Sequence, residues 1–319
     1  MEFSLIDRIR ERTAQARDDV RLGIGDDAAL LAVPAGQELA VAIDTLVEGV
    51  HFPRGTAAAD IGWKALAVNL SDLAAMGATP AWALLALTLP NADADFIDGL
   101  ATGFAQLAQP YRLALVGGDT TRGALTISVA VHGFVPAGKA LTRTGAQVGD
   151  LVMVTGTLGD AAAGLRLVQQ GGQDDPRSAW LIERLNRPVP RIAAGLALRD
   201  CASACIDVSD GLLADLGHIC AAGAVGAQID ASLLPRSSAL LDWFDDDASL
   251  DFALSGGDDY ELCFTVSPQK LAATQAELAR LGCGATRIGR IVAGEGVCVR
   301  DRDGRQRATA RPGWDHFAA

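Results

Sequence analysis

The sequence predicts an α+β fold with two domains, and three observations support this prediction. Helix-like and strand-like segments mix along the chain without the regular alternation of a doubly wound sheet. At 319 residues, 50% of them hydrophobic, the chain is long enough to build more than one core. Turn-forming residues gather in residues 136–150, and we place the boundary there, between domains of residues 1–140 and 141–319.

In the first half, apolar periodicity and helix-ending residues define the elements. Residues 1–12 resemble a soluble helix. Further helices are predicted for residues 60–76, ended by Gly77 and Pro80, and for residues 94–108, ended before Pro110. An apolar run predicts a strand at residues 39–43 that stops at Asp44, and similar runs predict strands at residues 82–89, 112–116 and 125–135.

The second half repeats this mixture after the turn-rich segment. Strands are predicted at residues 151–154, 204–206 and 260–266, with short strands near Ile288 and Val297. Helices are predicted at residues 161–170, 178–199, 211–222 and 268–281.

Composition excludes several classes of partner. The net charge of −12 argues against nucleic acid, because binding it requires a basic face. The longest apolar stretch, near residues 81–89, is too short to span a bilayer, and no signal-like segment opens the chain. All six cysteines lie from Cys201 onward without a CxxC pair, so we expect reduced thiols in a cytoplasmic protein rather than a zinc site.

The most informative feature is a set of aspartates beside glycines or at the ends of apolar strands, where a scaffold presents functional groups. Carboxylates gathered in one cleft repel one another unless cations neutralise them. Mg²⁺ prefers oxygen ligands and usually binds together with phosphates. The pattern therefore predicts a magnesium-dependent phosphate enzyme that uses Asp27, Asp44, Asp72, Asp119, Asp207 and Asp210.

Each of these motifs also has an ordinary explanation. GIGDDAA is compatible with a simple Gly-Asp turn, Asp72 with an exposed helix face, and DVSDG with a helix N-cap. GGDTT combines backbone amides that can contact phosphate with a carboxylate that can hold metal. Arg143, in LTRTG, is either a clamp on a phosphoryl oxygen or a surface arginine. The prediction depends on the recurrence of the pattern along one chain.

Two better-known phosphate motifs are rejected. Residues 23–28 match GxGxxA, but two adjacent aspartates would repel a pyrophosphate and no convincing strand precedes them. Residues 133–140 nearly match a P-loop, but Ala140 stands where a hydroxyl must hold Mg²⁺.

Taken together, the motifs resemble the thiamine-monophosphate kinase family. The resemblance spans residues 3–317, and this family belongs to the superfamily of aminoimidazole ribonucleotide synthetase and selenophosphate synthetase. DTLVEGVHF and the terminal GWDHF point to the kinase rather than only to the superfamily. The other matching segments are GIGDDAA, NLSDLAAMGATP, GGDT, LTRTGAQVGD, VTGTLGDAAAGL, DVSDGLLADLGH and GGDDYEL.

The resemblance implies ATP-dependent phosphorylation of thiamine monophosphate to thiamine diphosphate. It also implies an N-terminal α/β domain whose sheet joins that of a second copy in a homodimer, and a C-terminal α+β domain. Carried over by position, the six aspartates would hold several Mg²⁺ ions. Gly118, Asp119, Arg143 and Ser209 would contact ATP, and His51, Asp258 and Trp314 would contact thiamine monophosphate.

The sequence departs from the family pattern in three ways. Ala42 and Ile43 replace hydroxyl residues before Asp44, so any metal contact there must use main-chain carbonyls. Asp258 is one methylene shorter than the frequent glutamate, and Trp314 occupies a variable aromatic position that suits stacking.

The chemistry requires no general acid or base, because a phosphate monoester is already nucleophilic at neutral pH. We therefore expect direct in-line transfer and assign no acid–base residue. Selenophosphate synthetase would need a reactive cysteine near the N-terminus, and none precedes Cys201. An aminoimidazole ribonucleotide synthetase-like enzyme and a non-catalytic nucleotide or Mg²⁺ sensor remain as alternatives.

Overall fold

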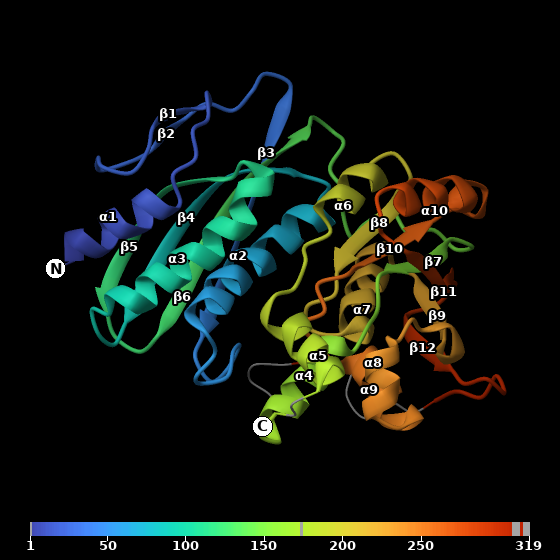
Figure 1. Cartoon of the computed structure of the whole chain (residues 1–319). Helices are drawn as coiled ribbons and strands as arrows, with labels where there is room; N and C mark the ends of the chain where they lie inside the picture. The colour runs from blue at the N-terminus through green and yellow to red at the C-terminus, as the bar shows by residue number, and fades with distance from the viewer. Residues whose placement is uncertain (1, 173–174, 308–312, 315–319) are drawn as a thin grey trace. The chain divides into compact units, whose positions relative to one another are not determined.

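The computed structural model describes residues 2–172, 175–307 and 313–314. The chain forms two compact units. The first unit comprises Met1–Leu73 and Ala78–Gly138, and the second comprises Ala74–Gly77 and Lys139–Ala319. After the short segment Ala74–Gly77, the chain returns to the first unit and finally passes into the second between Gly138 and Lys139, inside the turn-rich segment of residues 136–150 (Figure 1).

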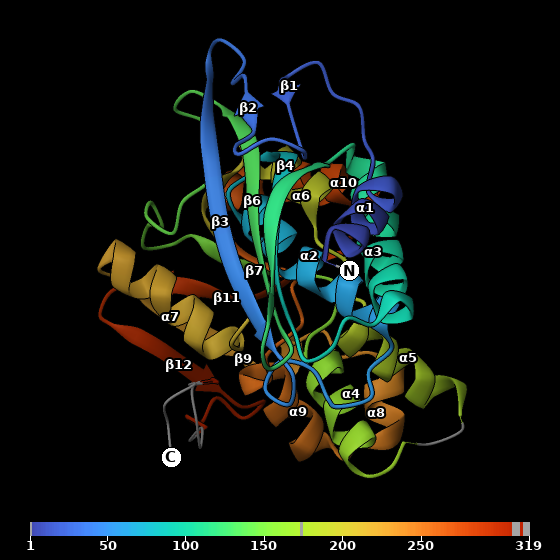
Figure 2. The ribbon, with the colours of Figure 1, turned by 90° about the vertical axis from the view of Figure 1, so that its left-hand side faces the viewer.

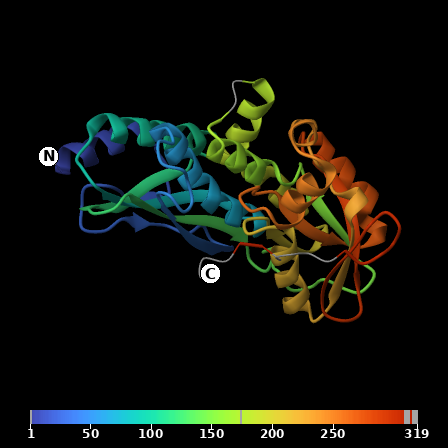
Figure 3. The same cartoon turned by 90° about the horizontal axis from the view of Figure 1, so that it is seen from below.

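The first unit is built on a four-stranded sheet in the order β3-β6-β4-β5, in which only the β4–β5 pair is parallel. Helices α2 and α3 lie on one face of this sheet (Figure 3). The elements are α1 (Glu2–Arg12), β1 (Val20–Leu22), β2 (Leu30–Leu31), β3 (Gln37–Val47), α2 (Ala58–Ala75), β4 (Thr79–Leu89), α3 (Ala94–Ala108), the 3₁₀ helix η1 (Gln109–Tyr111), β5 (Ala114–Arg122) and β6 (Thr126–Pro136).

Alternation along β6 explains which face is covered. Ile127, Val129 and Val131 are fully buried toward the helices, whereas the residues between them are partly exposed. The opposite face and the β3 edge remain more open, and Val41 and Ile43 of β3 are 58% and 66% exposed. Strand β3 is an edge strand of the sheet (Figure 2).

The second unit contains a six-stranded mixed sheet in the order β12-β9-β11-β7-β10-β8. Its pairs are antiparallel except for β12–β9. A core of aliphatic side chains, including Val152, Ile206 and Leu216, joins the sheet to helix α7. The elements are β7 (Leu151–Thr155), α4 (Asp160–Gln169), α5 (Pro176–Asn186), α6 (Ile192–Leu198), β8 (Ala202–Asp207), α7 (Leu212–Gly223), β9 (Gly226–Asp230), η2 (Ala231–Leu233), α8 (Ser238–Trp243), α9 (Asp246–Ser255), β10 (Leu262–Val266), η3 (Pro268–Lys270), α10 (Leu271–Arg280), β11 (Ala285–Val292) and β12 (Gly296–Arg300).

Several sequence-based boundaries require correction. The strand predicted to stop at Asp44 continues to Val47, and the GGDTT segment, predicted to be a loop, lies inside β5. The single helix predicted for residues 178–199 is two helices, because Pro188 and Pro190 lie between α5 and α6 and proline cannot continue the helical hydrogen-bond ladder. Strand β9 and helices α8 and α9 were not predicted.

The mixed α+β class with two domains is confirmed by the observed elements and units. Helix α3 begins and ends at the predicted residues. Within the described ranges, no helix is long and apolar enough to cross a membrane.

Candidate functional site

In the first unit, a hydrogen bond links the backbone of Asp44 to Asn69, which lies on the same helix as Asp72. Asp44 lies on β3 opposite the buried Val129, so its side chain is on the helix-covered face of the sheet. Its backbone N–H donates to Asn69 Oδ1 at 3.0 Å, and Asn69 is fully buried on α2. Asp72 follows Asn69 by three residues on the same helix. The structure therefore brings these two predicted metal residues to neighbouring elements at one edge of the sheet.

Asp119 lies at the other edge of this sheet. It sits on β5 opposite Ala86, on the exposed face, and is itself exposed. Because β3 and β5 are the two edge strands of a four-stranded sheet, Asp44 and Asp119 of one chain are separated by roughly 14 Å. These two carboxylates cannot share an ion within one chain.

Gly118 has a structural requirement of its own. A Cβ at this position would lie 1.9 Å from the carbonyl oxygen of Leu85 on β4, so only glycine permits the observed approach of the two strands. A role in ATP binding is therefore not needed to explain this glycine, although its exposed backbone is compatible with one.

Asp27 is exposed in the loop between β1 and β2, and its N–H donates to Asp26 Oδ1 at 2.9 Å. Asp19, at the base of this hairpin, accepts hydrogen bonds from Trp82 Nε1 at 3.0 Å and from Arg17. The Arg17 guanidinium lowers the pKa of Asp19. This contact ties the base of the loop to the sheet.

His51 is held in a defined orientation. Its Nδ1 accepts a hydrogen bond from the Val47 N–H at 3.0 Å, so a neutral imidazole carries its proton on Nε2. The Lys64 ammonium, on α2, donates to the His51 carbonyl at 3.0 Å and is 1% exposed. Lys64 had no predicted role, although a lysine in an alanine- and leucine-rich helix was a visible signal.

In the second unit, the loop after β8 gathers several predicted residues. Asp207 ends β8 and is 5% exposed. The Ser209 carbonyl accepts the Asp258 N–H at 2.8 Å, and the Asp210 carbonyl accepts the Trp314 N–H at 2.9 Å. The structure therefore joins predicted nucleotide, metal and substrate residues through one stretch of main chain. The Trp314 residue itself is 57% exposed.

Asp215, which the sequence analysis missed, supports this loop. Its Oδ2 accepts hydrogen bonds from the N–H groups of Ser209, Asp210 and Gly211. Burial, and then the nearby charges of Asp207 and Asp210, raise the pKa of Asp215 to about 7. Its position in the first turn of α7, directly after DVSDG, was the available signal.

The GGDDYEL segment is fixed by several of its acidic side chains. Asp258 has a positive φ of 68° and accepts a hydrogen bond from Tyr260 Oη at 2.9 Å. Asp259 is 1% exposed and accepts the Gly159 N–H at 2.6 Å, at the start of α4. Burial raises the pKa of Asp259 well above its ordinary value.

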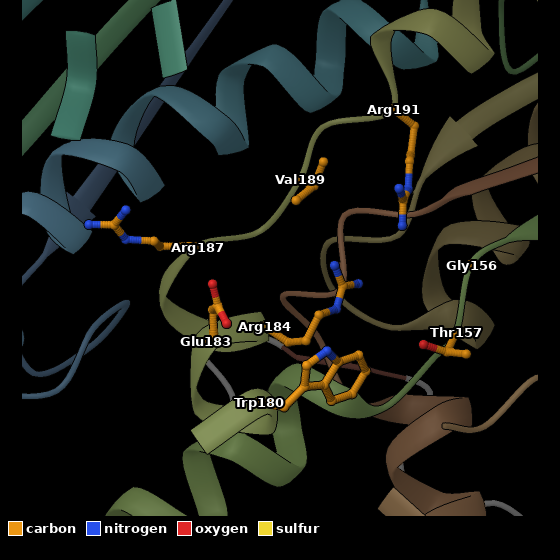
Figure 4. Close-up of a pocket in the computed structure, with 8 residues that line it drawn as sticks. All are labelled: Gly156, Thr157, Trp180, Glu183, Arg184, Arg187, Val189 and Arg191. Atoms are coloured by element: carbon orange, nitrogen blue, oxygen red, sulfur yellow. The ribbon is translucent and has the colours of Figure 1, made fainter. Parts of the chain in front are cut away.

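Glu261, in the same segment, is fully buried under a cavity of about 340 Å³. Thr155 Oγ1 donates to it at 2.7 Å, and Arg184 Nη2 and Arg191 Nε donate at 3.0 and 2.6 Å. Arg184 and Arg191 consequently point toward each other at the cavity, whereas Arg187 points away from them (Figure 4). The cavity is lined by Gly156, Thr157, Trp180, Glu183, Arg184, Arg187, Val189 and Arg191.

Arg143 is exposed in the connecting segment before β7. The carbonyl of the preceding Thr142 accepts the Cys205 N–H at 2.9 Å, which places the segment beside β8. Arg143 is therefore close in the fold to the strand that ends at Asp207.

No three or more His, Cys, Asp or Glu side chains form a metal-holding group in the described part of the chain. Mg²⁺ often binds one or two carboxylates and completes its shell with phosphate oxygens and water.

The chain is similar to known proteins along most of its length. The family model for AIR synthase related protein, N-terminal domain, matches residues 25–135, and that for the C-terminal domain matches residues 147–302. Thiamine-monophosphate kinase of Escherichia coli (strain K12) is 51% identical over 320 residues, covering 99% of this chain and 98% of the relative. The Bacillus subtilis (strain 168) enzyme of the same name is 39% identical and covers 90% of both chains.

The chain is also similar to solved structures of proteins with the same name. The crystal structure of thiamine-monophosphate kinase from Stenotrophomonas maltophilia K279a has a TM-score of 0.89 and 54% identity, covering 96% of this chain and 98% of that chain. The structure described as AaThiL complexed with AMPPCP and TMP has a TM-score of 0.79 and 33% identity, covering 99% and 97%. Escherichia coli HypE, at 24% identity and a TM-score of 0.78 over 98% of both chains, shares the fold.

Proposed function

Because the chain belongs to the thiamine-monophosphate kinase family, we propose that it transfers the terminal phosphoryl group of ATP to thiamine monophosphate and forms thiamine diphosphate. The observation that carries this proposal is the loop after β8. It presents Ser209 and Asp210 while its carbonyls hold the segments of Asp258 and Trp314. One loop can therefore place both reactants.

We assign Gly118, Asp119, Arg143 and Ser209 to ATP. Arg143 is exposed and has a planar fork that suits a phosphoryl oxygen. The exposed main chain at Gly118 and the hydroxyl of the partly buried Ser209 offer further polar contacts.

We assign His51, Asp258 and Trp314 to thiamine monophosphate. Because Nδ1 accepts the Val47 N–H, a neutral His51 carries its proton on Nε2, and this is the atom that we assign to the substrate phosphate. The exposed indole of Trp314 suits the thiamine rings, one of which is cationic.

We assign Asp27, Asp44, Asp72, Asp119, Asp207 and Asp210 to several Mg²⁺ ions. The carboxylate chemistry fits this metal, and the separation of Asp44 from Asp119 fits more than one ion per chain. When bound, Mg²⁺ would neutralise the repulsion between the two phosphorylated reactants.

The residues that hold the reactants then supply orientation rather than proton transfer. A substrate phosphate oxygen attacks the terminal phosphorus of ATP in line, the bond to the ADP oxygen breaks, and no phosphoenzyme forms. No side chain is assigned as acid or base, because the attacking phosphate is ionised at neutral pH.

We also propose that the chain is a cytoplasmic homodimer. The exposed edge strand β3 has eleven residues and presents Leu39, Val41 and Ile43, which are 41%, 58% and 66% exposed. A long apolar edge strand is a liability for a monomer, and pairing with a second sheet would cover it. The six cysteines are free thiols, as is usual in a reducing compartment.

The test is to incubate the purified protein with ATP, Mg²⁺ and thiamine monophosphate and to measure thiamine diphosphate and ADP together. Equal amounts of both products are expected, and omission of thiamine monophosphate should stop ADP release. Nucleotide binding without any product would favour the sensor. ADP release driven by an aminoimidazole ribonucleotide precursor instead would favour the synthetase alternative.

A further inference from the structure

Three consecutive peptide groups lie between Asp215 and the segments that carry the predicted substrate residues. On one side, the N–H groups of Ser209, Asp210 and Gly211 donate to the same oxygen of Asp215, at 3.0, 3.1 and 3.2 Å. Asp215 is 3% exposed, so these bonds are made away from bulk water.

On the other side, the carbonyl oxygens of the same three peptide groups accept hydrogen bonds from two other segments of the second unit. These bonds run from the N–H of Tyr260 to Val208, from that of Asp258 to Ser209 and from that of Trp314 to Asp210, at 2.9, 2.8 and 2.9 Å. Each peptide group thus joins the Asp215 carboxylate to one residue of the GGDDYEL segment or to Trp314.

This arrangement couples the two sides physically. A carboxylate that accepts an N–H polarises the peptide group and strengthens its carbonyl as an acceptor, and hydrogen bonds in series reinforce one another in a low-dielectric site. Displacing the loop by a fraction of an ångström would move Ser209 and Asp210 together with the residues bonded to their carbonyls.

A simple helix cap does not require this arrangement. Asp245 caps α9 in the ordinary way, with its Oδ1 accepting the Ala248 N–H at 2.8 Å at an exposed position. Asp215, in contrast, is 3% exposed, follows the α7 N-cap Gly211 by four residues, and accepts three loop N–H groups on one oxygen.

We propose that Asp215 is a positioning residue for both nucleotide and substrate binding. It fixes the peptide groups between residues 208 and 211 by accepting their N–H groups, on the side opposite to their carbonyl oxygens. The proposal rests on the proposed function, because it takes Ser209 and Asp210 as nucleotide and metal residues and Asp258 and Trp314 as substrate residues. It adds that one side chain, itself in contact with neither ligand, controls the affinity for both.

The experiment compares the Asp215→Ala, Asp215→Asn and Asp245→Ala variants with the parent protein. KM for ATP and for thiamine monophosphate is measured separately, together with kcat, the melting temperature, and calorimetric binding of a non-hydrolysable ATP analogue with Mg²⁺. Asp215→Ala should raise both KM values by about tenfold and weaken analogue binding similarly, because three buried N–H groups lose their acceptor. Asp245→Ala should lose stability through its missing cap while both KM values change by less than about twofold.

Asp215→Asn keeps the shape and one acceptor oxygen but loses the charge, so both KM values should rise by roughly threefold. This variant decides the question if Asp215→Ala does not fold. A folded Asp215 variant with unchanged KM values and unchanged analogue affinity would overturn the proposal, as would a change in one KM alone. A parent protein that makes no thiamine diphosphate would instead remove the proposed function, and with it the premise of this inference.

Discussion

The two units place their predicted site residues by different means. In the second unit, Ser209, Asp210, Asp258 and Trp314 are joined by main-chain hydrogen bonds around one short loop. In the first unit, Asp27, Asp44, Asp72 and Asp119 lie on a loop, an edge strand, a helix and the opposite edge strand. The first unit by itself therefore does not form a single carboxylate cage.

The difference affects what a mutation can change. The bonds that link the loop after β8 to its neighbours use backbone N–H and C=O groups, so replacing the Asp210 side chain removes a charge without breaking them. In the first unit, a side chain connects the elements, because Asn69 of α2 accepts the Asp44 N–H. A side-chain substitution in the loop after β8 should therefore change ligand binding with less effect on the local structure than one in the first unit.

The largest effect should follow removal of a predicted metal carboxylate in either unit. Asp72→Asn and Asp210→Asn each keep the side-chain shape, and each should reduce kcat by about 100-fold and raise the Mg²⁺ concentration needed for half-maximal rate. Steady-state kinetics across a Mg²⁺ titration measure both quantities. Asp210→Asn should keep the parent's melting temperature more closely than Asp72→Asn does.

The matched control is Asp245→Asn, at the exposed N-cap of α9 and assigned to no metal ion, which should keep the parent's Mg²⁺ dependence. Near-parental turnover in both Asp72→Asn and Asp210→Asn would contradict the assignment of these carboxylates to metal.

A second prediction concerns the buried Glu261, which is held by Thr155, Arg184 and Arg191. Glu261→Gln leaves two arginines around a neutral amide and should cost about 3 kcal/mol in the free energy of unfolding. For a unit of this size, the melting temperature should fall by roughly 10 °C. Differential scanning calorimetry measures the change.

Glu183→Gln provides the comparison, because Glu183 lines the same cavity but is exposed. Its melting temperature should stay close to that of the parent, since exposed charges contribute little to stability. Equal melting temperatures for the two variants would show that Glu261 does not anchor this part of the second unit.

Sequence patterns predicted the elements whose ends carry local signals. Helix α3 ends where expected because Pro110 follows it closely. The end of β3 was wrong because a charged residue was taken as the end of a strand, whereas Asp44 remains in the ladder of an edge strand whose side chains can reach solvent. Strand β9 has only five residues between a helix and a 3₁₀ helix, and its pairing with β11 and β12 is visible only in three dimensions.

In the candidate site, too, the residues with a local sequence signal were predicted and those defined by their contacts were not. The aspartate motifs were found because carboxylates beside glycines form a local pattern, and the family followed from their order. Asp215 and Lys64 were missed because their importance lies in the backbone groups that they contact, four to six residues before Asp215 and 13 residues before Lys64. A sequence identifies a carboxylate or an ammonium, but not which main-chain groups it will contact.

The smallest predicted effect is a difference between the two units in how the free energy of unfolding depends on pH. In the second unit, burial raises the pKa of Asp160, whose carboxylate accepts hydrogen bonds from Thr157 and Ser237. The folded state therefore keeps a proton that the unfolded chain releases above pH 3.8, and the free energy of unfolding decreases as pH rises through that window. In the first unit, Arg17 lowers the pKa of Asp19, so its contribution has the opposite sign and is lost as pH falls through the lowered pKa.

Asp160→Asn should consequently lose less stability than the parent when pH is raised from about 4 to 7, because its amide does not titrate. Asp19→Asn should be destabilised relative to the parent most strongly at neutral pH, where the ionised Asp19 accepts from Arg17 and Trp82. Urea unfolding at a series of pH values, without Mg²⁺ or nucleotide, gives both differences. If the two variants shifted the pH dependence in the same direction, the contrast between a desolvated acid in one unit and an ion-paired acid in the other would be wrong.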